Sequence, residues 1–198
     1  ERWSMDVVHE TLADGRPFRI LTVVDHGSCS SPVVEARGRM SGELVGQLLD
    51  RVLGEATGPG SITVDHGTEF QSRAVEDYAS RRGVQLDFTR PEKPVEHAFI
   101  ESCNGQLRNE CLKVHQFASL AESQAVLDAW RLDYNSCRPH SSIGHLTPSE
   151  FVSQRQEEWI VKDVVCSGLK LPRGPRQCRP AWFDPMVPVW KGDRADQA

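Results

Sequence analysis

The sequence lacks the features that mark membrane, secreted and zinc-stabilised proteins. No apolar run approaches the roughly 18 residues that span a bilayer, and the N-terminus has no basic segment followed by an apolar stretch, as a signal peptide would. The six cysteines form no Cys-x-x-Cys pair, which argues against a structural zinc site and a disulfide scaffold. We therefore expect a globular protein with free thiols in a reducing cytoplasm.

The sequence also lacks the basic excess of proteins that bind nucleic acid by themselves. Its net charge is −5 and its isoelectric point is about 5.8, whereas such domains are usually basic. Any affinity for nucleic acid must then come from local basic patches or from another domain. The chain begins with a glutamate rather than a methionine, and we expect it to be a segment of a longer protein.

The hydrophobic pattern predicts an α/β domain. We expect strands at 3–10, 18–24, 32–36, 61–64 and 84–88, and helices at 41–53, 72–82, around Glu101 and at 119–135. The first three strands follow one another as a meander, and the last two alternate with helices. This order predicts a mixed five-stranded sheet, its first three strands antiparallel, with helices on both faces.

Local signals set the helix ends. Ser41 suits an N-cap, the segment 58–60 (GPG) a helix stop, and Gly83 a C-cap. In the last helix, Leu127, Trp130 and Tyr134 fall on one face, which predicts that this face is buried.

The chain divides into two parts by composition. Residues 1–152 carry the periodic pattern, whereas residues 153–198 hold five prolines and isolated tryptophans among charges. We expect a single core domain over 1–152 and a disordered C-terminal extension over 153–198.

Three carboxylates are candidates for a metal site. Asp6 lies within an apolar strand, Asp65 follows another strand, and Glu101 comes after 35 intervening residues. A carboxylate inside apolar β structure is unfavourable unless it is paired or bound to metal. Mg²⁺ prefers such oxygen ligands, and two ions can promote phosphoryl transfer. The alternative is that each residue is an ordinary solvated charge.

Four motifs occur in order along residues 2–152. They are 3–6 (WSMD), 63–70 (TVDHGTEF), 91–105 (PEKPVEHAFIESCNG) and 134–151 (YNSCRPHSSIGHLTPSEF). Together with the Asp-x35-Glu spacing they resemble the integrase-core (DDE) transposases of bacterial insertion sequences, relatives of retroviral integrases.

The resemblance implies a ribonuclease H-like fold and a transposase catalytic domain. Its activity would be Mg²⁺- or Mn²⁺-dependent nicking of DNA, followed by strand transfer from the freed 3′-hydroxyl. Asp6, Asp65 and Glu101 match the catalytic triad, which would hold two metal ions. The implied partners are transposon ends, target DNA, further copies of the chain and an upstream helix-turn-helix region, in a bacterial cytoplasm at the nucleoid.

Further residues match the family motifs near the triad. Asn104, Gly105 and Arg108 are candidates for DNA contact, although Arg108 could instead pair with an acid on the surface. Asp25, His66 and His97 are candidates for supporting the carboxylates. Relatives usually have asparagine at the positions of His66 and His97. Residues 138–145 match a signature that we expect to pack the last helix against the core.

Two other functions are compatible with the sequence. A ribonuclease H-like nuclease would use similar carboxylates but would leave the motif at 138–151 without a purpose. An inactive transposase remnant would only bind DNA or dimerise with an intact copy.

Overall fold

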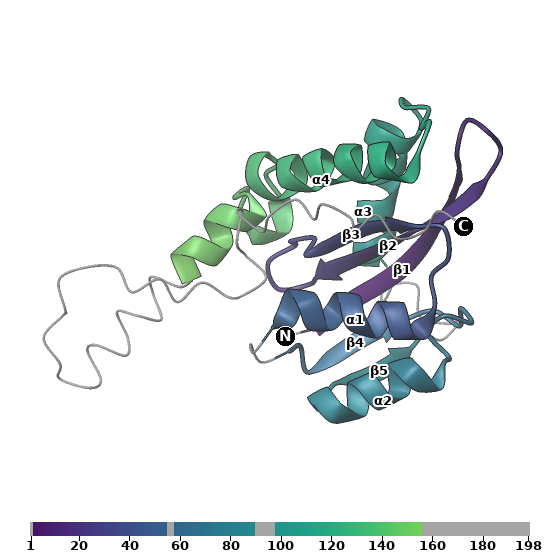
Figure 1. The fold of residues 1–198 in the computed structure, drawn as a ribbon. Helices are drawn as coiled ribbons and strands as arrows, with labels where there is room; N and C mark the ends of the chain where they lie inside the picture. The colour runs from purple at the N-terminus through teal and green to yellow at the C-terminus, as the bar shows by residue number, and fades with distance from the viewer. Residues whose placement is uncertain (1, 55–57, 90–97, 156–198) are drawn as a thin grey trace, which may run out of the picture.

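The sheet of the protein is mixed and five-stranded, as the sequence predicts. The computed structural model describes residues 2–54, 58–89 and 98–155. The strands are β1 (Arg2–Thr11), β2 (Pro17–Asp25), β3 (Val33–Arg37), β4 (Ser61–Val64) and β5 (Gln85–Phe88), in the order β3-β2-β1-β4-β5 (Figure 1). The first three are antiparallel neighbours, and β4 and β5 continue the sheet in parallel with β1.

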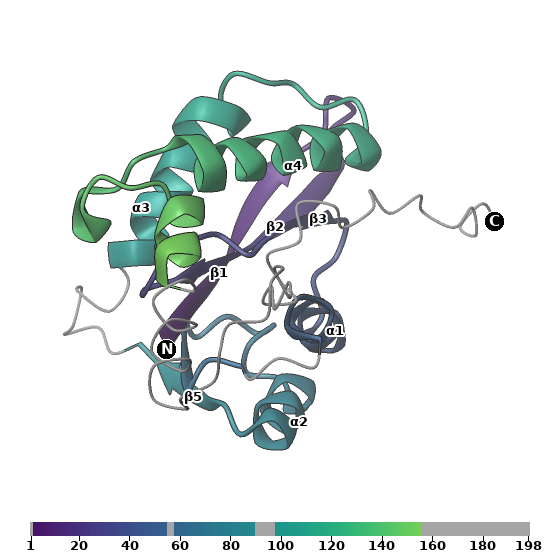
Figure 2. The ribbon, with the colours of Figure 1, turned by 90° about the vertical axis from the view of Figure 1, so that its left-hand side faces the viewer.

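Helices cover both faces of this sheet (Figure 2). On one face lie α1 (Gly42–Leu53) and α2 (Arg73–Arg82), and on the other α3 (Ala98–Leu107) and α4 (Leu120–Cys137). Side chains alternate along β1, so Met5 and Val7 enter the first core while Val8 enters the second. The prediction of helices on both faces is confirmed.

Both predicted caps are confirmed. The Ser41 side chain accepts a hydrogen bond from the backbone N–H of Leu44, and Ser119 caps α4 in the same way by accepting from the backbone N–H of Glu122. Gly83 ends α2 in the left-handed conformation at φ 66°. α1 ends at Leu53, as predicted, and Gly54 at φ 51° follows it directly, before the GPG segment.

The sequence-based prediction missed some helical segments. A π-helical turn, Arg108–Leu112, continues α3, and a 3₁₀ turn spans Ser141–Ile143. Residues 148–155 are also helical, so the structure carries helix across the predicted domain boundary at 152. The rest of the predicted extension, 156–198, lies outside the described residues.

Arg138, the first residue after α4, links that helix to the rest of the domain, as predicted for the segment 138–145. Arg138 bonds to Glu110 in the turn after α3, and its guanidinium also pairs with Asp133 at 2.8 Å. Trp130 donates from Nε1 to the same Glu110 at 3.0 Å. Asn135 accepts from the backbone N–H of Ser31 at 2.8 Å, which ties α4 to the β2–β3 loop.

In the part of the chain that the structure describes, no helix combines the length and apolar character needed to cross a membrane.

Candidate active site

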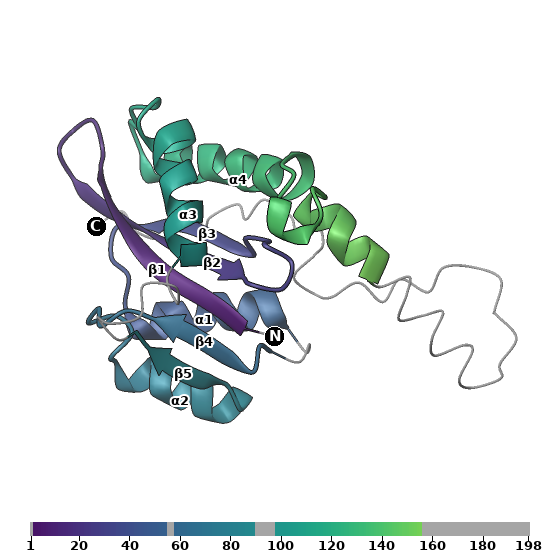
Figure 3. The same cartoon turned by 180° about the vertical axis from the view of Figure 1, so that it is seen from behind.

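Asp6 lies in the middle of β1, and its side chain is on the face covered by α3, where it meets Asn104. Figure 3 shows α3 and β1 from this side. Asp6 is partly buried, and its Oδ1 accepts a hydrogen bond from the backbone N–H of Val7 at 2.7 Å. Its Oδ2 accepts from Nδ2 of Asn104 on α3, also at 2.7 Å. Hydrogen bonds to an ionised acceptor are stronger than neutral ones. This contact therefore joins the first strand to a helix nearly a hundred residues later.

Asp65 follows β4 directly, at the end of a strand that pairs in parallel with β1. This pairing matches Ser4 with Thr63, and the same offset carried two residues further would bring Asp65 level with Asp6. The Asp65 Oδ1 accepts from the backbone N–H of Gly67 at 2.9 Å. A Cβ at Gly67 would lie 2.9 Å from this oxygen, so the motif needs glycine there.

Glu101 belongs to the first turn of α3 and is exposed. It precedes Asn104 by three residues, so both lie on neighbouring positions of the helix surface. Within the described ranges, however, no group of three His, Cys, Asp or Glu side chains is close enough to hold a metal ion. The strand register thus brings Asp65 toward Asp6, and α3, which bears Glu101, packs against β1. The three carboxylates do not form one cluster in the described part of the chain.

The donor chemistry at this point suits a hard divalent cation. Asp6 and Asp65 offer carboxylate oxygens at adjacent strand positions, and two neighbouring carboxylates repel each other unless a cation or proton lies between them. Oxygen ligands of this kind are those that Mg²⁺ prefers. Carboxylates at these two positions therefore suit such an ion, and Glu101 lies on the adjacent helix.

Asn104 lies beneath the site rather than on its surface. It is 1% exposed, and its Oδ1 has no hydrogen-bond partner among the described residues. Its amide reaches Asp6 because α3 packs against β1 through Ile100, Cys103 and Leu107. This placement makes Asn104 a support for Asp6, and its predicted contact with DNA stays a prediction.

The other predicted DNA contacts lie on the outer side of the same helical segment. A Cβ at Gly105 would meet no atom within 4 Å, so the surface there is open. Arg108 is exposed. Two acids that could pair with Arg108, Glu110 and Glu122, have other partners. Glu110 bonds to Arg138, and Glu122 accepts from the backbone N–H of Ala118.

The contacts of Asp25 and His66 are with residues other than Asp6 and Asp65. Asp25 is 4% exposed and closes the turn after β2, where it accepts from the Gly27 backbone N–H and the Ser28 hydroxyl. The exposed His66 ring lies 5.6 Å from that of Phe88 on β5. His97 lies outside the described residues.

A residue that the sequence-based prediction passed over links β1 with α3. The His26 ring stacks on Phe99 with ring centroids 4.4 Å apart, and its Nε2 lies 2.5 Å from the Ser4 hydroxyl. Burial, and secondly the charge of Arg2, lower the pKa of His26 below its ordinary value of 6.5. Its position in a turn gave no sequence signal, because the partner phenylalanine is distant in the chain.

Comparison with known families shows which family these elements belong to. Two family models, both described as integrase core domain, match the chain, one over residues 1–94 and the other over residues 82–148. The two matches together take in every residue of the site described above.

Curated relatives come from bacterial insertion elements. The chain is 41% identical over 156 residues to an uncharacterized protein of insertion element IS407 from Burkholderia multivorans, which covers 79% of the chain and 56% of the relative. It is 39% identical to a protein of IS476 from Xanthomonas euvesicatoria, covering 77% and 44%. The chain thus spans about half the length of the curated relatives it matches.

Solved structures with the same fold come from retroviral integrases. An intasome of simian T-cell lymphotropic virus matches with a TM-score of 0.64 at 16% identity, over 76% of the chain and 53% of the viral chain. The catalytic core domain of HTLV-2 integrase, solved with magnesium, matches with a TM-score of 0.58 at 14% identity, over 76% and 95%. These similarities establish a ribonuclease H-like fold.

Proposed function

The chain belongs to the integrase core domain family, and on that premise we propose that it is the catalytic part of an insertion-element transposase. It would nick DNA at the ends of the element and join the freed 3′-hydroxyl to target DNA. The observation that supports this proposal most directly is the hydrogen bond from Asn104, on the helix that bears Glu101, to Asp6, on a strand that pairs in parallel with the strand leading to Asp65.

The residues that would hold Mg²⁺ or Mn²⁺ are Asp6, Asp65 and Glu101. When bound, a pair of such ions would activate the attacking oxygen and stabilise the leaving oxygen. The HTLV-2 integrase core that shares this fold was solved with magnesium, which supports the same choice of ion here. No covalent bond between protein and DNA is needed, so no serine or tyrosine is assigned a nucleophilic role.

The other side chains would position the carboxylates and the DNA. Asn104 holds one oxygen of Asp6, and the backbone N–H of Val7 holds the other. The Gly67 backbone N–H fixes Asp65 in the same way. On the outer side of the helix, Gly105 leaves room for a DNA strand, and Arg108 would contact a backbone phosphate. His66, His97 and Asp25 would support the site only indirectly.

The partners proposed for the chain are DNA and further copies of itself. The HTLV-2 core was solved in trimeric and dimeric forms, and the simian viral integrase in an intasome. Because the chain spans about half of its curated relatives, we place recognition of the element's ends in a helix-turn-helix region outside this chain. A DNA substrate would bring the protein to the bacterial nucleoid.

The proposal is tested with DNA that bears the terminal repeats of the element. The chain, joined to its upstream region, is incubated with this DNA in the presence and absence of Mg²⁺ or Mn²⁺. We expect metal-dependent strand transfer that falls at least about a hundredfold in Glu101→Gln, since even the partners of metal ligands contribute 10- to 100-fold. Glu76→Gln is the matched control, because Glu76 is exposed in the first turn of α2.

The same assay separates the alternative functions. Cleavage of the RNA strand of a hybrid, without strand transfer, would identify a ribonuclease H-like nuclease. Binding of DNA with no metal-dependent cleavage would identify an inactive remnant. Equal activities of Glu101→Gln and the wild type would refute the assigned triad.

A further inference from the structure

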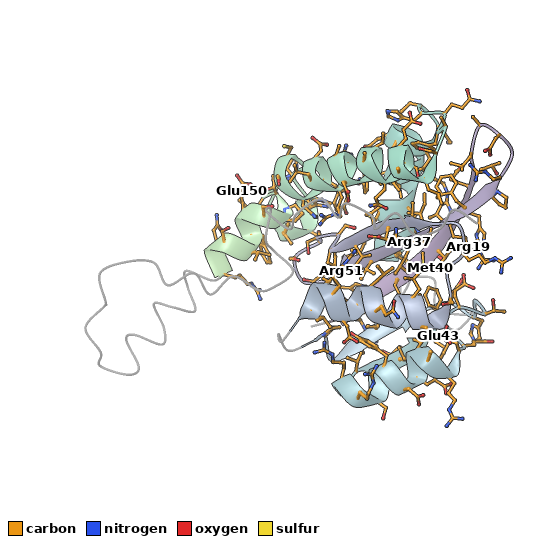
Figure 4. The ribbon with its side chains drawn as sticks, viewed as in Figure 1. Arg19, Arg37, Met40, Glu43, Arg51 and Glu150 are labelled. Carbon is orange, nitrogen blue, oxygen red and sulfur yellow. The ribbon has the colours of Figure 1, made fainter. Side chains whose placement is uncertain are left out.

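A second polar site lies on the opposite face of the sheet from Asn104, beyond the N-terminal end of α1. It is a pocket of about 620 Å³ between the far ends of β1 and β2 and the loop that follows β3. Its lining includes His9, Arg19, Arg39 and Met40. Figure 4 shows Arg19, Arg37 and Met40 gathered above the start of α1.

The strand register aligns basic side chains along this pocket. His9 of β1 is paired with Arg19 of β2, which is paired in turn with Arg37 of β3. Like charges at directly opposite positions of a sheet destabilise it. Glu35 binds Arg37, but the side chains of His9 and Arg19 both line the pocket.

Acidic partners only partly neutralise these cations. The nearest contact of Arg19 with an acid is 3.8 Å from Glu69, too long for a hydrogen bond. Arg39 is exposed and has no ion pair with any residue that the structure describes. Glu10 is the one acid among the residues that line the pocket, and strand alternation turns it to the opposite face from His9. In a chain of net charge −5, such a local positive excess indicates an anionic ligand.

The pocket is connected to the aspartate pair by a single loop. Asp65 begins this loop, and Glu69, four residues later, faces Arg19. The loop is held against α1, where a Cβ on Gly42 would lie 1.7 Å from the Ser72 Oγ. Four residues span at most about 14 Å, which is roughly four nucleotides of one DNA strand.

We propose that this pocket, through Arg19 and Arg39, binds a backbone phosphate of the DNA strand whose reacting end lies at Asp6 and Asp65. The assignment rests on the proposed function and adds to it a second contact, on the far side of the loop 65–72 from the carboxylates. The contact is to phosphate, so it positions the DNA without reading its sequence.

The test measures the binding of a fluorescein-labelled duplex with the terminal repeat by fluorescence anisotropy, at salt concentrations from about 50 to 200 mM. Arg39→Gln should weaken binding about tenfold near 0.1 M salt and reduce the slope of log affinity against log salt by about 0.9. Arg39→Lys should restore most of both values. Arg73→Gln is the control for net charge, since the Arg73 side chain is 92% exposed on α2.

Two outcomes overturn the inference. If Arg39→Gln and Arg73→Gln bind alike, the pocket makes no phosphate contact. If Arg39→Gln lowers self-association in sedimentation velocity but not DNA affinity, the pocket faces a second copy of the chain. The proposed function is judged separately by strand transfer with the wild type, so DNA binding that depends on Arg39 without any cleavage would reject the function alone.

Discussion

The two aspartates and the glutamate of the candidate site are held by different kinds of structure. Asp6 lies in β1 and Asp65 directly follows β4, and the parallel ladder between these two strands sets their relative register. Glu101 belongs to α3, which reaches the sheet by side-chain packing and by the bond from Asn104 to Asp6. We refer to these as the strand half and the helix half of the site.

The difference between the halves concerns how precisely each is fixed. A ladder of backbone hydrogen bonds cannot shift by less than a residue pair without breaking, whereas a packed helix can adjust by small displacements. Glu101 is exposed on α3, and among the described residues no three His, Cys, Asp or Glu side chains form a group that could hold a metal ion. Substrate or metal binding would therefore have to complete the site on the helix side.

The largest expected effect comes from loosening the strand half. Ile62 is fully buried in the four-residue strand β4 that leads to Asp65. Ile62→Ala should lower the free energy of unfolding by about 2–5 kcal/mol, and Ile62→Val by about 0.5–1.5 kcal/mol, as measured by urea denaturation. Leu132→Ala is the control, because Leu132 is 56% exposed and should change stability by less than about 0.5 kcal/mol. A loss at Ile62 no greater than at Leu132 would contradict the role given to β4.

An intermediate effect is expected at the joint between the halves. Asn104→Ala removes the donor from Asp6 and should cost about 1–3 kcal/mol of stability, together with a 10- to 100-fold loss of strand transfer. Asn109→Ala is the matched control, because Asn109 is exposed and bonds only to Lys113 among the described side chains. If both variants retain wild-type strand transfer, the helix half does not depend on this bond.

The smallest effect is expected from His26, which bridges the halves through Ser4 and Phe99. A histidine whose pKa is lowered on folding binds fewer protons in the folded state, so stability falls as the pH drops below its ordinary value of 6.5. His26→Phe keeps an aromatic ring against Phe99 and removes the titration. Urea denaturation of both proteins from about pH 5 to pH 8 should therefore show a smaller loss at low pH in the variant.

The pH difference between the two proteins isolates His26 from other groups. His140 also has a pKa lowered by burial and by the charge of Arg138, but it titrates in wild type and variant alike. The stability difference should be constant above about pH 7.5 and change below it. A difference that is constant over the whole range would show that His26 is not a titrating link between the halves.

Much of the fold was predictable because its signals are local. The spacing of Leu44, Leu48 and Leu49 predicted an amphipathic helix, and Ser41 and Gly83 marked helix ends that the structure confirms. The end of α1 at Leu53 also agrees with the prediction, and Gly54 at φ 51° follows it directly. The π-helical turn at Arg108–Leu112 was missed because its wider turn depends on packing against α4 rather than on residue type.

In the candidate site, too, the residues were predictable from local motifs, whereas their long-range contacts were not. The motifs alone identified Asp6, Asp65 and Glu101, because these residues sit in recognisable local patterns. Sequence could not reveal that Asn104 is buried under Asp6, or that His26 stacks on Phe99, since each partner lies more than seventy residues away in the chain.

The sequence by itself determined the elements of this protein, their order and the family to which they belong, because periodicity, caps and motif spacing act over short distances. Only the tertiary structure decided the strand order β3-β2-β1-β4-β5, the adjacency of the two aspartates and the row of basic residues from His9 to Arg37. Those features depend on which strands pair and in what register. Pairing of distant strands is selected by the burial of both faces of the sheet together, which no single segment specifies.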